Sequence, residues 1–307
     1  MIRFDNGGDH EWFMRILVPV IVFTCLCGIA SAAETIAVGK SSFEFVDHQG
    51  DATRPVTVWT FIPEGCLPGC PVQYVFHGVE RNGEEYLGNW IGFAKAGRFI
   101  VVVPEFSRKH YPKDADYSLG RALDESDPEK RPFAVPDHLF EHLKSRLQFD
   151  AATYRAFGHS AGGQFVQRWL LFRPESRASV IIAANPGWYT LPEWNPERVR
   201  FPFPFSLVGS PIGQQQLQQA LSRRFTLMLG ERDIDPRDKN LNRSPGASAQ
   251  GVHRLERGQN FFVAAREAAG RLDLPFVWDL VVVPGARHDN FAMARAAVEY
   301  MNRNVPK

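Results

Sequence analysis

Short apolar runs alternate with stretches of helical spacing along most of the chain. The runs are rich in Val, Ile and Phe and are bounded by turn-forming residues, which is typical of buried strands. We expect strands over 56–62, 72–76, 99–103, 153–157, 180–184, 224–229 and 276–283. Helical spacing predicts helices over 84–95, 139–147, 161–172 and 290–304, and the charged stretch 107–134 is typical of a surface loop.

Strands that alternate with helices predict an α/β fold, in which a mostly parallel central sheet carries helices on both faces. In such sheets the chemistry takes place at the carboxyl ends of the strands. No internal repeat, low-complexity tract or linker divides residues 34–307, so we expect one domain there. Functional side chains are therefore expected in the loops that follow strands.

Residues 1–33 differ from the rest of the chain. An uncharged run over 16–33 follows a basic residue and closes in small residues, which is typical of a cleaved secretory signal peptide. A start at Met14 gives a cleaner signal than the acidic segment before it, so we expect Met14 to be the true start. A retained membrane anchor is the alternative, but the run is short for a bilayer span and contains Pro19 and Gly28.

Charge and composition exclude several classes of partner. The chain has 307 residues, a formal net charge of +1 and 44% hydrophobic residues, which is ordinary for a globular protein. Neither the net charge nor any Lys/Arg block would attract nucleic acid or an anionic membrane. We therefore expect no nucleic-acid partner and no membrane contact after signal cleavage. The substrate apart, we expect no further partner and a monomer.

Two of the four cysteines leave with the signal peptide, and Cys66 and Cys70 remain. An even pair in an exported protein favours a disulfide. Four-ligand zinc sites need further Cys or His residues nearby, and none is close in the sequence, so we expect no metal. The pair is interpreted as a local cross-link.

A candidate nucleophile lies between an expected strand and an expected helix. The segment from Gly158 to Gly163 reads GHSAGG, which is the G-x-S-x-G pattern with Ser160 at its centre. A tight strand-to-helix turn leaves no space for side chains two positions either side of the serine. The turn exposes the hydroxyl and brings the N–H of Ala161 to a helix N-terminus, where it can bind an oxyanion.

A serine hydroxyl needs a base, and in chains with this motif the acid and then the histidine follow the serine. His288 follows the strand expected over 276–283, whereas His253 lies in a polar stretch with no strand before it. His288 is therefore the predicted base. Asp233 follows the strand over 224–229 and is the predicted acid, with Asp235 as the alternative, because a small error in turn register exchanges them.

The second oxyanion donor is expected in the turn after the strand over 72–76, which reads His77-Gly78-Val79. The N–H of Val79 would join that of Ala161 on the developing negative charge. The turn lacks the triple glycine of some lipases and esterases, and His77 is interpreted as a residue that holds the loop by hydrogen bonds.

With these segments the chain resembles the α/β-hydrolase superfamily, and within it the secreted poly(3-hydroxybutyrate) depolymerase and feruloyl-esterase-like group. The matching segments are VFHG at 75–78, GHSAGG at 158–163, GERD at 230–233 and PGARH at 284–288. The resemblance implies a periplasmic or secreted serine esterase that needs no cofactor or metal. A peptidase or acyltransferase with the same triad, and a non-catalytic hydrolase fold used for binding, are the alternatives.

Residues 187–222 lie where this fold often carries a cap, and we interpret them as a short cap-like insertion. The segment is rich in aromatic residues and proline, and Trp188 and Tyr189 are candidates for lining the substrate cleft. Equally, the aromatic residues can fasten the segment to the body of the protein. A short insertion favours an open cleft, which suits short-chain, aromatic or polyester-type esters.

Overall fold

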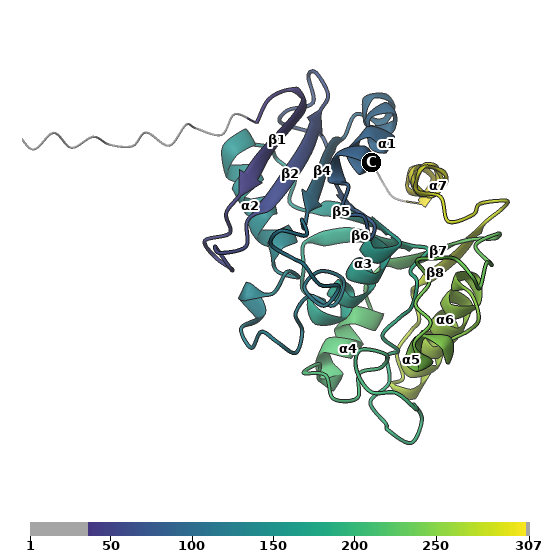
Figure 1. The fold of residues 1–307 in the computed structure, drawn as a ribbon. Helices are drawn as coiled ribbons and strands as arrows, with labels where there is room; N and C mark the ends of the chain where they lie inside the picture. The colour runs from purple at the N-terminus through teal and green to yellow at the C-terminus, as the bar shows by residue number, and fades with distance from the viewer. Residues whose placement is uncertain (1–35, 305–307) are drawn as a thin grey trace, which may run out of the picture. The chain divides into compact units, whose positions relative to one another are not determined.

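The computed structural model describes residues 36–304, which are built on one eight-stranded sheet (Figure 1). The predicted signal peptide over 1–33 lies outside the described residues. The strands are β1 (Gly39–Phe45), β2 (Val56–Ile62), β3 (Val72–Phe76), β4 (Ile100–Glu105), β5 (Tyr154–His159), β6 (Ala178–Ala184), β7 (Phe225–Gly230) and β8 (Asp279–Val283). The helices are α1 (Gly83–Gly97), α2 (Val135–Leu147), α3 (Ala161–Phe172), α4 (Gln214–Leu221), α5 (Pro245–Ser248), α6 (Arg254–Arg271) and α7 (Asn290–Asn304), with a short 3-10 helix η1 (Pro128–Lys130).

The strands follow the order β1-β2-β4-β3-β5-β6-β7-β8. The pairs β1–β2 and β2–β4 are antiparallel, and all pairs from β4–β3 to β7–β8 are parallel. The carboxyl ends of six neighbouring strands, from β4 to β8, therefore meet at one edge of the sheet. This confirms the predicted α/β-hydrolase fold class with its mostly parallel sheet.

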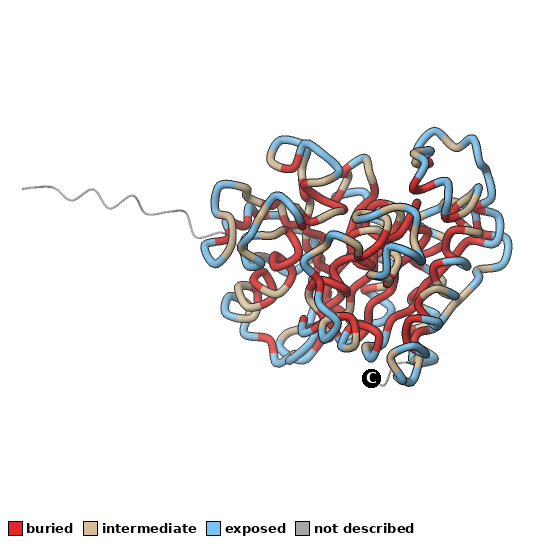
Figure 2. Tube along the Cα trace, turned by 90° about the horizontal axis from the view of Figure 1, so that it is seen from below, coloured by how far each residue is buried: buried red, intermediate tan, exposed pale blue. Residues whose placement is uncertain are grey.

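Two apolar layers hold the helices to the sheet. Successive strand residues point to opposite faces, so Tyr74 and Phe76 belong to one layer and Val75 to the other. Helices α1 and α7 cover the face of Val75, while α2, α3, α4 and α6 cover the opposite face. Figure 2 shows the central strands as the most continuously buried part of the trace. Within residues 36–304, no helix has the length and apolar character needed to cross a bilayer.

The expected elements agree with the structure wherever the local pattern is strong. β2, β3, α3 and α7 have the predicted bounds. Five elements were not predicted, namely β1, η1, α4, α5 and α6. β1 is an edge strand in which only Phe43 and Phe45 are buried, so its sequence lacks a continuous apolar run. β8 begins at Asp279 rather than at 276, because its pairing with β7 starts there.

Candidate active site

Ser160 lies on a sharp turn between β5 and α3. Its φ of 58° is in the left-handed region, and its N–H donates a 2.9 Å hydrogen bond to the Ala184 carbonyl. A Cβ at Gly158 would lie 2.2 Å from the Gly162 carbonyl oxygen, and one at Gly162 would lie 2.1 Å from the Phe76 carbonyl oxygen. Neither position has space for a side chain, so the turn requires glycine at both. The Ser160 side chain between them is partly exposed.

His288 lies between Ser160 and Asp233. Its Nε2 is 2.9 Å from the Ser160 Oγ, and its Nδ1 is 2.7 Å from the Asp233 Oδ2. Asp233 follows β7 and His288 follows β8, which are neighbouring parallel strands, so their loops meet at the same sheet edge. Asp235 is exposed, and its carboxylate accepts a hydrogen bond from the Arg237 N–H. The three residues that the sequence predicts are thus brought together in one hydrogen-bonded chain.

A buried arginine contacts the other oxygen of Asp233. Arg254, the first residue of α6, places Nη1 3.3 Å from the Asp233 Oδ1 and Nη2 2.9 Å from the Asp238 Oδ1. The Arg254 side chain is 2% exposed and that of Asp233 is 3% exposed. Asp238 is therefore an ion-pair partner of Arg254, and sequence analysis missed both. The only local signal was the helix-start pattern His253-Arg254-Leu255-Glu256, in which His253 caps α6 by accepting from the Glu256 N–H.

His159 packs beside His288 as a neutral ring. The two ring centroids are 4.7 Å apart, and the Tyr86 hydroxyl lies 3.1 Å from the His159 Nδ1. Burial holds the pKa of His159 well below its ordinary value, and the nearby His288 and Arg254 lower it further. His159 is therefore uncharged at neutral pH.

The loop after β3 is fixed by His77. Its Nε2 accepts a 3.0 Å hydrogen bond from the Phe106 N–H, and its Nδ1 donates to the Gly78 carbonyl at 3.0 Å. Burial lowers the pKa of His77 to about 3, so the ring stays neutral and keeps this pair of bonds. Val79, which follows in the loop, lines the same cleft as Ser160 and Ala161. The two residues whose amides are expected to bind an oxyanion thus line the cleft that contains Ser160.

The cleft at Ser160 has a volume of about 340 Å³ and mostly polar walls. Its side chains come from the loops after β3, β6 and β7, the 107–134 loop and α3. They include Asp114, Ser118, Gln164, Lys239, Asn240 and Asn242, with Val79, Ala161, Trp188 and Leu241 as the apolar members.

Of the two aromatic residues predicted for the cleft, only Trp188 lines it. The expectation for Tyr189 is wrong, because its side chain is fully buried and stacks on Phe261 at 4.4 Å between centroids. Within 187–222, Trp188 is the only residue that borders the cleft. The ring of Phe203 packs on Phe172 of α3, and Tyr189 packs on α6, so the aromatic residues of this segment fasten it to the body.

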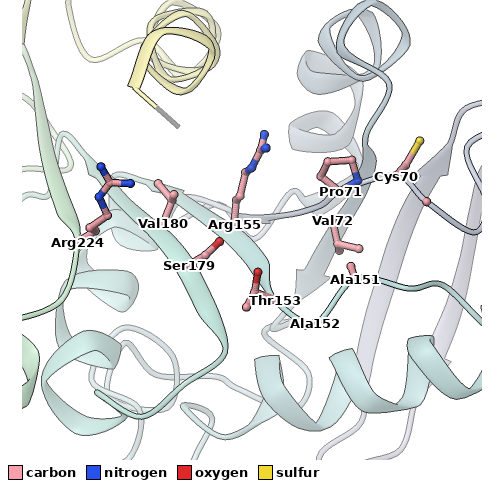
Figure 3. A pocket seen from close by; sticks show the side chains of 11 residues that line it. Cys70, Pro71, Val72, Ala151, Ala152, Thr153, Arg155, Ser179, Val180 and Arg224 are labelled. Atoms are coloured by element: carbon pink, nitrogen blue, oxygen red, sulfur yellow. The ribbon is translucent and has the colours of Figure 1, made fainter. Parts of the chain in front are cut away.

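A second cavity, of about 430 Å³, opens at the amino ends of the parallel strands (Figure 3). Arg155 and Arg224 project from its lining, which contains no His, Asp or Glu. The predicted disulfide between Cys66 and Cys70 is present, and Cys70 borders this cavity. Within residues 36–304, no group of three or more His, Cys, Asp or Glu side chains is arranged to hold a metal ion.

The fold and the sequence are similar to those of known hydrolases. No protein-family model and no curated protein matches the chain. Poly(aspartic acid) hydrolase-1 from Sphingomonas sp. KT-1 is 34% identical, with a TM-score of 0.81 over 86% of this chain and 98% of that one. LpqC, a poly(3-hydroxybutyrate) depolymerase from Bordetella parapertussis, is 33% identical, with a TM-score of 0.81 over 88% and 93% of the two chains. An S-formylglutathione hydrolase from Agrobacterium tumefaciens, 15% identical over 88% of this chain and 96% of that one, has the same fold with a TM-score of 0.55.

Proposed function

This chain belongs to the α/β-hydrolase superfamily as an esterase-type hydrolase related to a poly(3-hydroxybutyrate) depolymerase, and from that premise we propose that Ser160, His288 and Asp233 are its catalytic triad. The observation that carries the proposal is the unbroken hydrogen-bond path from the Ser160 Oγ through the imidazole to the Asp233 carboxylate. In that path Asp233 holds the Nδ1–H tautomer, which leaves Nε2 free to accept the serine proton.

In the proposed reaction the Ser160 Oγ attacks the ester carbonyl carbon while its proton moves to the His288 Nε2. The tetrahedral oxyanion accepts hydrogen bonds from the amides of Val79 and Ala161. The intermediate then expels the alcohol, which takes the proton from His288, and leaves an acyl ester on Ser160. Water attacks this ester and gives its proton to His288, the carboxylic acid leaves, and the proton returns to Ser160.

For the substrate we propose polyester-type esters of short hydroxy acids. A mostly polar cleft, with Trp188 as its only aromatic residue among residues 36–304, favours chains in which polar ester groups recur at short intervals. It offers little apolar wall to a long alkyl group. The similarity to a poly(3-hydroxybutyrate) depolymerase supports this class. The similarity to a poly(aspartic acid) hydrolase favours a second candidate, an anionic polyamide, for which Lys239 would supply a cation in the cleft.

Export from the cytoplasm is part of the proposal. It is supported by the Cys66–Cys70 disulfide, which persists in oxidising compartments, and by the signal-like run over 16–33. A polymeric substrate outside the cell would meet the enzyme in that compartment.

We test the triad with Ser160→Ala. Because the nucleophile is lost, we expect kcat on p-nitrophenyl butyrate to fall by about 10⁴-fold or more, and labelling by a fluorophosphonate probe to disappear. Hydroxybutyrate oligomers should be cleaved faster than poly(aspartic acid), measured by chromatography of the shortened products.

The matched control is Ser179→Ala, since Ser179 is an exposed serine of β6 in the cavity at the other sheet edge. It should keep wild-type activity and labelling. Undiminished turnover in Ser160→Ala would overturn the triad, and faster cleavage of poly(aspartic acid) would favour the second substrate.

A further inference from the structure

Arg254 is in contact with the candidate acid through both its side chain and its helix. Its Nη1 lies 3.3 Å from the Asp233 Oδ1, while the neighbouring Leu255 N–H donates a 3.2 Å hydrogen bond to the Asp233 carbonyl. The start of α6 therefore holds Asp233 at two points. One carboxylate oxygen faces the guanidinium, and the other faces the His288 Nδ1.

The second arm of the same guanidinium holds the loop that forms one wall of the cleft. Arg254 Nη2 lies 2.9 Å from the Asp238 Oδ1, and this oxygen also accepts a 2.8 Å hydrogen bond from the Asn240 N–H. The residues that follow, 239–242, line the cleft beside Ser160. One buried charge thus joins the carboxylate behind His288 to the turn that shapes the substrate site.

We propose that Arg254 is a positioning residue of this enzyme, which aligns Asp233 behind His288 and, through Asp238, sets the 239–242 wall of the substrate cleft. The inference rests on the proposed function of Ser160 and His288. It goes beyond that function by making substrate binding and base alignment depend on one side chain that touches neither substrate nor serine.

The geometry requires an arginine. A guanidinium has a rigid, planar fork whose two terminal nitrogens reach two carboxylates at once, whereas an ammonium is a single point charge. Both Asp233 and Arg254 are almost completely buried, so removal of the cation leaves a buried carboxylate free to turn away from His288.

The test measures kcat and KM with p-nitrophenyl butyrate in full-length variants. In Arg254→Met we expect kcat to fall by about tenfold to a hundredfold, because Asp233 is misplaced, and KM to rise, because the 239–242 wall loses its support. Arg254→Lys should recover part of kcat or KM but not both, since its ammonium reaches one carboxylate. Asp238→Asn should act mainly on KM.

Arg257→Met is the matched control. Arg257 is equally buried on the same helix, but it hydrogen-bonds the Gly251 and Gly187 carbonyls and not Asp233. It should lower stability in urea while leaving kcat and KM unchanged. The inference is overturned if Arg254→Met and Arg257→Met have the same kcat and the same KM.

If Arg254→Met does not fold, wild-type kcat and KM in Arg254→Lys would overturn the inference. A wild-type protein that neither hydrolyses the ester nor reacts with a fluorophosphonate would instead overturn the proposed function itself.

Discussion

At the scale of single residues, Asp233 carries two contacts that its neighbour Asp235 cannot make. One oxygen of Asp233 faces the His288 Nδ1 and the other faces Arg254, and the residue is 4% exposed. Asp235, two positions later, is exposed and caps its own turn at the Arg237 N–H. The Asp233 carboxylate is therefore fixed behind the His288 ring, whereas the Asp235 carboxylate, two positions later, is solvated.

We expect Asp233→Asn to lower kcat by about 10⁴-fold, because an amide can donate to the Nδ1 of His288 and so favour the wrong tautomer. Asp235→Asn should leave kcat almost unchanged. Steady-state hydrolysis of p-nitrophenyl acetate by both variants compares the two carboxylates directly. A larger loss at Asp235 would show that the wrong residue has been assigned as the acid.

At the scale of elements, a buried histidine joins α2 to two segments distant in sequence. The His138 Nδ1 lies 2.8 Å from the Asp47 Oδ2 in the turn after β1, and its Nε2 lies 3.0 Å from the Glu129 Oε2 in η1. Burial acts to lower the pKa of His138, but the hydrogen bonds and charges of Asp47 and Glu129 outweigh burial and raise it. The contacts of His138 with these two carboxylates are therefore strongest when the ring is protonated.

A raised pKa in the folded state makes this contribution to stability depend on pH. It is complete below the ordinary imidazole value of 6.5 and is lost as pH rises through the raised value. We expect His138→Gln to lower the free energy of unfolding by roughly 1–3 kcal/mol near about pH 6, and by less near about pH 9. Urea unfolding at both pH values measures this free energy. The control is His48→Gln, at an exposed histidine, whose effect on the free energy of unfolding should be the same at both pH values. If the loss in His138→Gln were larger at the higher pH, the proposed role of the His138 ion pairs would be contradicted.

At the scale of the whole molecule, the candidate active site and the disulfide lie at opposite edges of the parallel sheet. Ser160, Asp233 and His288 follow the carboxyl ends of β5, β7 and β8, whereas the Cys66–Cys70 disulfide precedes β3 and lies toward the amino ends. The disulfide closes a loop with a sequence separation of only 4, so it restricts the unfolded chain little.

Replacing both cysteines by serine should therefore lower the free energy of unfolding by about 2 kcal/mol, without changing kcat. Thermal unfolding and ester hydrolysis of the double variant test the two halves of this expectation. A marked loss of kcat at unchanged stability would mean that the disulfide influences the geometry of the cleft at the opposite edge of the sheet.

The sequence determined the parts of the protein that depend on local patterns. Strong apolar runs located β2 and β3 with their bounds, and the spacing of Gly158, Ser160 and Gly162 specified the turn because no side chain fits there. The order of motifs after strands predicted His288 and Asp233, since parallel strands bring their carboxyl ends together. α6 was not predicted because charged residues and Gly258 interrupt its apolar face. The helix is stabilised by its packing against the rest of the protein rather than by its local sequence.

Only the tertiary structure decided which side chains face one another. Nothing in the local sequence indicates that Arg254 lies against Asp233, because that contact depends on how α6 docks on the loop after β7. For the same reason Trp188 borders the cleft and Tyr189 enters the core, although they are adjacent in the chain. Local propensity acts over a few residues, whereas burial and charge pairing depend on segments that meet only when the sheet has formed.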